Sequence, residues 1–181
     1  MDRRARGAAR CGGWHPSRVR HLEDLLANNE AYAAGFPAGE LERKPARRLA
    51  IVACMDARLD PEAALGLREG EAHVIRNPGG VVTDAEIRAL TVSQILLGTE
   101  QVLVIQHTDC GMRAFDEAGL MDRLEAETGI RPPWAAEPLG VLEDDVRTAV
   151  ERIRSSPFVP HTGAVNGLVF DVATGRMRLV A

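Results

Sequence analysis

The most restrictive feature of this sequence is a short, uninterrupted apolar run, Leu49–Cys54. A run of this length without polar alternation is typical of a parallel strand that is covered on both faces. Similar short runs follow at 73–76 and 101–106, and segments with helical periodicity lie between them. Strands that alternate with helices in this way predict right-handed crossovers and a mainly parallel sheet.

The other segments complete this pattern. The stretch from Thr83 to Glu86 has the sequence of a capping box, which predicts the start of a helix that ends at Gly98. Further helices are expected at 17–32, 61–67, 115–127 and 142–155. Strands at 167–172 and 176–180 flank a turn and are expected to form an antiparallel edge. The predicted fold class is α/β: a single domain over 17–181, with a mainly parallel β-sheet flanked by helices and an antiparallel edge strand.

Residues 1–16 are expected to form a disordered basic leader. The first twenty residues contain six arginines and one acid, so the remaining residues, with sixteen basic and twenty-five acidic groups, carry a net charge of −9. An acidic body argues against nucleic-acid binding, which needs clustered cations. Alternatives for the basic segment are an RNA- or membrane-contacting arm, a mitochondrial-type leader and a misassigned upstream start.

The sequence offers no segment for membrane insertion or secretion. No apolar run approaches the roughly 18 residues that a membrane span requires, and no apolar stretch has the form of a secretion signal. The three cysteines, an odd number, do not make a disulfide framework. We therefore expect a cytoplasmic protein with no membrane partner, whose cysteines bind a ligand or react.

Cys54 and His107 both stand at the carboxyl ends of predicted parallel strands. Ligands of open α/β sheets bind in the crevice outside those ends, so the two residues can meet although 53 positions separate them. Cys110 follows His107 by three residues and can reach the same ion. Two thiolates and one imidazole suit Zn²⁺, and three protein ligands with one open position are typical of a catalytic zinc site. Each residue alone would more often be structural, so the hypothesis depends on their combination.

An acid and a base, Asp56 and Arg58, follow the first of these cysteines. A carboxylate in this place can accept a hydrogen bond from a zinc-held hydroxide, and a guanidinium can hold that carboxylate through two bonds. The alternative is a surface ion pair, which contributes about 0–1 kcal/mol. The position in the crevice favours the functional interpretation.

Three sequence blocks resemble the signature blocks of the β-carbonic anhydrases in order and spacing. They are Cys54-Met-Asp-Ala-Arg58, Arg76-Asn-Pro-Gly-Gly80 and His107-Thr-Asp-Cys110-Gly111. The similarity runs from the helix at Ser17 to the final strands, about nine-tenths of the chain. It is strongest with the compact bacterial branch found in mycobacteria.

The resemblance implies a lyase that reversibly hydrates CO₂ to bicarbonate and a proton by zinc-hydroxide attack. One Zn²⁺ per chain would be held by Cys54, His107 and Cys110. Asp56 would orient the hydroxide and Arg58 would hold Asp56. In a closed form known from some members, this aspartate itself binds the metal.

The resemblance also implies a pocket for CO₂ and bicarbonate that is lined by Gly79, Gly80 and Gly111. Family members are homodimers or dimers of dimers, with the N-terminal helix packed on the neighbour, and we expect such an assembly here. Pro78 stands where the family commonly has alanine, and proline removes an amide donor, so this loop is expected to differ in shape. Ile51 stands where bicarbonate-inhibited members carry tryptophan, so no regulatory bicarbonate site is expected.

Three other functions are compatible with the same residues. The first is hydrolysis of a CO₂ analogue, carbonyl sulfide or carbon disulfide, and the second is a zinc-bearing regulatory role without catalysis. The third is thiol chemistry, with Cys54 as nucleophile and Cys110 as its resolving partner. A proton shuttle is unassigned, and the candidates by chemistry are His15, His21, His73 and His161.

Overall fold

The computed structural model describes residues 21–37, 39 and 41–181. The chain divides into two units, 1–40 and 41–181. In the first unit the described helix is α1 (Leu22–Ala33), whose residues are all exposed. The expected leader at 1–16 and the expected helix start at Ser17 lie outside the described residues.

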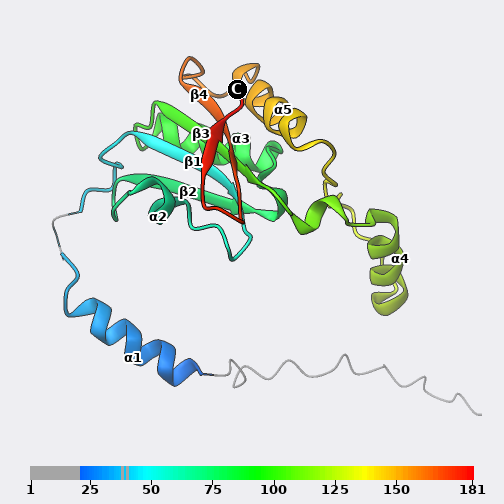
Figure 1. The fold of residues 1–181 in the computed structure, drawn as a ribbon, viewed down its shortest axis with the longest axis horizontal. Helices are drawn as coiled ribbons and strands as arrows, with labels where there is room; N and C mark the ends of the chain where they lie inside the picture. Colours follow the sequence, from blue (N-terminus) through cyan, green and yellow to red (C-terminus); the bar gives the residue numbers. More distant parts are fainter. Residues whose placement is uncertain (1–20, 38, 40) are drawn as a thin grey trace, which may run out of the picture. The chain divides into compact units, whose positions relative to one another are not determined.

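The second unit is built on a five-stranded sheet (Figure 1). Its strands are β1 (Leu49–Cys54), β2 (Ala72–Asn77), β3 (Gln101–His107), β4 (Val165–Phe170) and β5 (Met177–Leu179). Their spatial order is β2-β1-β3-β4-β5. The first four strands are parallel, and β5 pairs with β4 in the antiparallel direction. The predicted α/β fold with an antiparallel edge strand is confirmed.

Helices connect the parallel strands. They are α2 (Pro61–Leu65), α3 (Asp84–Ile95), α4 (Glu117–Thr128) and α5 (Leu142–Arg154), with short 3₁₀ turns η1 (Pro78–Gly80) and η2 (Gly111–Arg113). The predicted capping box opens α3: the Thr83 hydroxyl accepts from the Ala85 amide, and the Glu86 carboxylate accepts from the Thr83 amide. Capping groups of this kind satisfy amides that have no partner inside the helix.

The central strand β1 is buried along its whole length, as its apolar sequence predicts. Alternate side chains enter two different clusters, because successive residues of a strand point to opposite faces. Ala50 and Val52 pack with residues of α3 and α5 on one face. Ile51 and Ala53 lie in the other cluster, together with Cys54.

Several element boundaries differ from the sequence prediction. β4 covers 165–170 in place of the predicted 167–172, because the Asp171 carboxylate accepts from the Ala173 amide and begins the turn there. Helix α2 ends at Leu65, since Gly66 adopts a left-handed conformation with φ of 65°. Both differences come from local turn chemistry.

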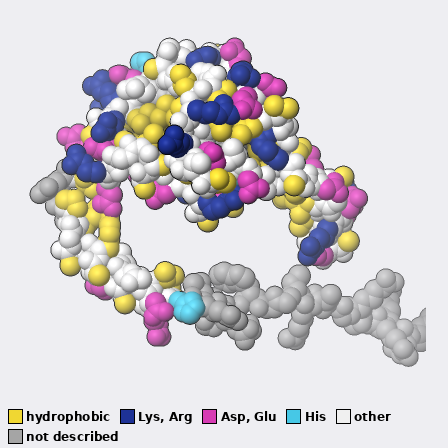
Figure 2. All heavy atoms as spheres, in the orientation of Figure 1, with side chains coloured by type: hydrophobic (Ala, Val, Ile, Leu, Met, Phe, Trp, Pro, Cys, Tyr) yellow, Lys and Arg dark blue, Asp and Glu magenta, His cyan; other side chains and the backbone are white. Residues whose placement is uncertain are grey.

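The surface drawn in Figure 2 carries basic and acidic side chains side by side over the body of the second unit. Among the described residues, no helix is both long and apolar enough to cross a membrane.

Turn η1 passes very close to the ends of β1 and β3. Gly80 has a φ of +64°, and a Cβ atom at this position would lie 2.9 Å from both the Cys54 amide nitrogen and the Ile105 carbonyl oxygen. These neighbours are backbone atoms of the central strands, so they cannot move without displacing the strands themselves. Glycine is therefore required here for its lack of a side chain as well as for its conformation.

We expect Gly80→Ala to destabilise the protein more than Gly66→Ala. The two glycines share a left-handed φ, +64° and +65°, but nothing lies within 4 Å of a Cβ at Gly66. Both variants bear the conformational cost of about 1–2 kcal/mol, and Gly80→Ala adds an overpacking cost of about 1–3 kcal/mol. Urea unfolding of both variants measures the difference, and equal losses would contradict this account.

Candidate metal centre

The three side chains predicted to bind zinc converge at one edge of the sheet. Cys54 ends β1 and His107 ends β3, and these strands are parallel neighbours. The short turn after β3 returns Cys110 to the same place. The ligand atoms of the three residues lie within 4.8 Å of one another, and the two sulfur atoms are 3.9 Å apart. All three residues are buried.

The His107 ring is oriented as a metal ligand would be. Its Nδ1 lies 2.8 Å from the Thr108 carbonyl oxygen, which fixes the ring and leaves Nε2 available. Nε2 is buried and has no hydrogen-bond partner, a situation that costs about 1–3 kcal/mol unless a ligand relieves it. Two sulfur donors and one imidazole nitrogen suit Zn²⁺. The donor set therefore fits zinc.

The two thiols have different acidities. Burial opposes ionisation of Cys54, but contact with the His107 ring and with the backbone amides of Asp56 and Gly79 outweighs it, and the pKa of Cys54 falls to about 7. Burial raises the pKa of Cys110 above 9.0, and the neighbouring Cys54 sulfur adds to the effect. One of the two sulfurs is thus prepared to bind a cation at neutral pH.

A carboxylate beside these ligands is held by an arginine. Arg58 donates from Nε to Asp56 Oδ1 at 3.0 Å and from Nη2 to Asp56 Oδ2 at 2.8 Å. The Arg58 amide also donates to Asp56 Oδ1, at 2.9 Å. These bonds hold the pKa of Asp56 well below its usual range. Asp56 Oδ2 lies 3.7 Å from His107 Nε2, so the carboxylate stands next to the free ligand atom.

Two residues that stand in the quoted sequence blocks, but to which the sequence analysis gave no role, also belong to this region. Asp109 accepts from Arg58, through its carboxylate at 2.8 Å and through its backbone carbonyl at 2.9 Å. Arg76 donates to three backbone carbonyls of the segment after β1, those of Cys54, Asp56 and Leu59. The position of Arg76 could have been predicted from the sequence. It lies near the carboxyl end of a predicted parallel strand, and Cys54 lies at the carboxyl end of the neighbouring strand.

The glycines expected to line the pocket occupy different settings. Gly79 and Gly80 are buried beside the end of β1, whereas Gly111 is exposed at the start of η2. Pro78 is the first residue of η1, a position where the missing amide of proline removes no bond within the turn. Asn77 closes this loop by bonding both the amide and the carbonyl of Val81.

The proton-shuttle candidates are scattered. His73 pairs with Ala50 near the amino end of β1, far along the strand from Cys54, and its Nδ1 lies 2.8 Å from Ser93 Oγ. His161 is joined to Gln94 through its backbone, and His21 belongs to the first unit of the chain. His15 lies outside the described residues.

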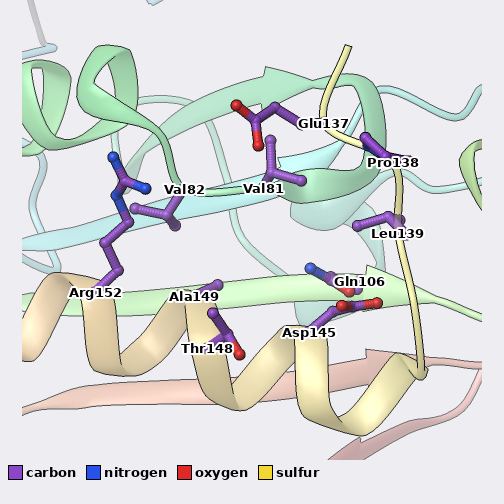
Figure 3. Close-up of a pocket in the computed structure, with 10 residues that line it drawn as sticks. All are labelled: Val81, Val82, Gln106, Glu137, Pro138, Leu139, Asp145, Thr148, Ala149 and Arg152. Carbon is purple, nitrogen blue, oxygen red and sulfur yellow. The ribbon is translucent and has the colours of Figure 1, made fainter. Parts of the chain in front are cut away.

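A cavity of about 190 Å³ lies between β3, α5 and the segment 137–139 (Figure 3). It is lined by Gln106 of β3, by residues of α5 such as Ala149, and by the segment 137–139. Gln106 precedes His107, and successive strand residues point to opposite faces. Gln106 therefore points to the α5 side of the sheet, but Leu139 of the cavity wall also packs against the cluster that contains Cys54 and Cys110, so the cavity shares a residue with the surroundings of the candidate metal centre.

We expect the metal-free protein to release two thiol protons in separate steps. The lowered pKa of Cys54 places its step near pH 7, and the raised pKa of Cys110 places its step at higher pH. The ultraviolet absorbance of thiolates measures both steps in a Cys11→Ser background, and Cys54→Ser should remove the first step and move the second to lower pH, because the Cys54 sulfur contributes to the raised pKa of Cys110. A single step shared by both thiols in the parent protein would contradict the assignment.

Comparisons with known proteins agree with this geometry. The sequence model described as "Carbonic anhydrase" matches residues 49–136. "Beta-carbonic anhydrase 1" of Mycobacterium tuberculosis is 51% identical over 158 residues, which cover 87% of this chain and 96% of that protein. A "Carbon disulfide hydrolase" of Acidithiobacillus thiooxidans is 35% identical over 153 residues, covering 73% of this chain and 76% of that protein.

A solved structure shares the fold over almost the whole chain. The carbonic anhydrase of Streptococcus mutans superposes with a TM-score of 0.82 at 37% identity, and the match covers 89% of this chain and 98% of that one. The strand-end cysteines and histidine thus occur in a chain that is similar to carbonic anhydrases in both sequence and fold. This chain belongs to the β-carbonic anhydrase family.

Proposed function

We propose that this chain catalyses the reversible hydration of CO₂ to bicarbonate and a proton, at a zinc ion held by Cys54, His107 and Cys110. The observation that carries the proposal is the convergence of two thiols and an unpartnered imidazole nitrogen within 4.8 Å, beside a carboxylate fixed by arginine. The similarity to "Beta-carbonic anhydrase 1" along 87% of the chain supports it.

Zinc in such a site lowers the pKa of water to about 7 and makes a hydroxide nucleophile available at neutral pH. The protein residues position the reaction. Because Arg58 keeps the pKa of Asp56 low, Asp56 is ionised throughout the neutral range and acts as a hydrogen-bond acceptor. We assign it the role of turning the attacking oxygen toward CO₂ by accepting that oxygen's proton in a hydrogen bond.

Two arginines stabilise Asp56 and the backbone around it. Arg58 fixes the orientation of the Asp56 carboxylate. Arg76 holds the irregular backbone that follows β1 through the carbonyls of Cys54 and Leu59. The proposed pocket walls come from Gly79, Gly80 and Gly111.

We propose a homodimer or a dimer of dimers as the working assembly. A 12-residue helix is marginal in water unless its apolar side chains are covered, and α1 exposes Leu22, Leu25 and Leu26. We also propose the cytoplasm as the location, because Cys54 and Cys110 are free cysteines and a reducing compartment keeps such thiols available for metal.

Hydrolysis of carbon disulfide or carbonyl sulfide is the second candidate function. The observation that favours it is the 35% identity to the "Carbon disulfide hydrolase" of Acidithiobacillus thiooxidans. Parallel turnover measurements on CO₂, carbonyl sulfide and carbon disulfide separate the two functions. One zinc per chain without turnover of any of these substrates would favour the regulatory role without catalysis. Coordination of both thiols by zinc would exclude thiol chemistry.

We expect Asp56→Asn to lower kcat/KM for CO₂ hydration about 10–100-fold while one zinc per chain is retained. The amide keeps the shape of the side chain but loses the charge that Arg58 binds, and it replaces one of the two acceptor oxygens by a donor, so it cannot accept from Arg58 and from the nucleophile together. Stopped-flow hydration at pH values on both sides of about 7, together with zinc quantification, measures the effect.

Asp122→Asn is the matched control, because Asp122 forms an exposed ion pair with Arg131 at 2.9 Å, outside the metal centre. Its activity should equal that of the parent. An Asp56→Asn variant with parental kcat/KM and full zinc would overturn the role assigned to Asp56.

A further inference from the structure

Arg58 lies between two acidic residues. Asp56 is bound on one edge of the guanidinium, and Asp109 on the other, at 2.8 Å from Nη1. The Asp109 carbonyl oxygen adds a bond to Nη2 at 2.9 Å. All three guanidinium nitrogens are therefore engaged, although the Arg58 side chain is 47% exposed.

The backbone of Asp109 is shaped for this contact. Its φ is +54°, a left-handed conformation that is costly for most residues and that aspartate tolerates better than most. The Asp109 side chain is 79% exposed and supplies no packing to the core. A strained residue whose carboxylate and carbonyl both contact one arginine indicates a specific task.

The position of Asp56 suggests what that task is. Its Oδ2 lies 3.7 Å from His107 Nε2, the buried nitrogen without a partner. Once a metal ion is bound at the cysteine–histidine cluster, the carboxylate would have two competing cations within reach, that ion and the Arg58 guanidinium. A half-exposed arginine with one anchor rotates away easily, whereas an arginine with anchors on both edges does not.

We propose that Asp109 is a positioning residue that locks Arg58 in place and thereby keeps Asp56 off the metal. This role rests on one part of the proposed function: Cys54, His107 and Cys110 hold a catalytic divalent metal that has an open coordination position. Asp109 acts through Arg58 on Asp56, and the result is that the open position stays available to a small ligand.

The test is anion binding to protein that contains Co²⁺ in place of Zn²⁺. Thiocyanate binding at the open position changes the visible spectrum of the metal, and the titration needs no catalytic turnover. We expect Asp109→Asn, which suits the left-handed backbone but removes the charge, to weaken thiocyanate binding about tenfold, because the released Asp56 competes for the metal. A failure of the proposed function would appear separately, as absent CO₂ hydration with normal thiocyanate binding.

The same titration in an Asp56→Asn background isolates the route of the effect. Without the competing carboxylate, adding Asp109→Asn should leave thiocyanate affinity unchanged. Asp144→Asn is the matched control, since Asp144 pairs with Arg147 at the same distance of 2.8 Å on α5. Parental affinity in Asp109→Asn, an equal loss in the Asp56→Asn background, or loss of cobalt itself would each overturn the proposal.

Discussion

The parallel pairing of β1 with β3 is the constraint on which the rest of the structure depends. Registered pairing brings the carboxyl ends of the two strands to one edge of the sheet, and the terminal residues Cys54 and His107 meet there. The pairing itself depends on a β1 sequence that tolerates burial on both faces. A polar side chain within 49–53 would therefore destabilise the sheet and, with it, the arrangement of the candidate metal ligands.

Beyond the strand ends the chain loses regular hydrogen bonding, and arginine side chains replace it. Arg76 binds carbonyls of the segment after β1, and Arg58 joins that segment to the turn after β3. On the other face, Arg113 joins Gln106 of β3 to Asp145 of α5. A guanidinium has five donors in a planar fork, so a single side chain can fix two or three loop atoms. The candidate site thus lies on irregular backbone that arginine side chains hold in place through hydrogen bonds.

The sequence predicted the sheet, its antiparallel edge and the residues that meet at its carboxyl end, because all of these follow from periodicity and strand polarity. The Asp56–Arg58 bonds were predicted from the position of the two charges beside Cys54 and from the family resemblance, and they are present. The second anchor at Asp109 was not predicted, since it requires a left-handed backbone at a residue other than glycine. The two-residue displacement of β4 has a similar cause, as the Asp171 side chain ends the strand where apolar alternation continues. The hydrophobic pattern of the sequence does not report such side-chain and backbone interactions in turns, so these two features could not be predicted from it.

The two buried glycines of η1 differ in what they permit over evolutionary time. A side chain at Gly79 would meet the tip of Leu139, which can swing aside, whereas one at Gly80 would meet the backbone of both central strands. Both positions have a left-handed φ that strains most side chains, but only at Gly80 does the obstacle consist of backbone atoms that no second substitution can move. Glycine is thus required at position 80 for two reasons, whereas a designer who wishes to reshape this loop at position 79 must satisfy its left-handed φ of +83° and make room beside Leu139.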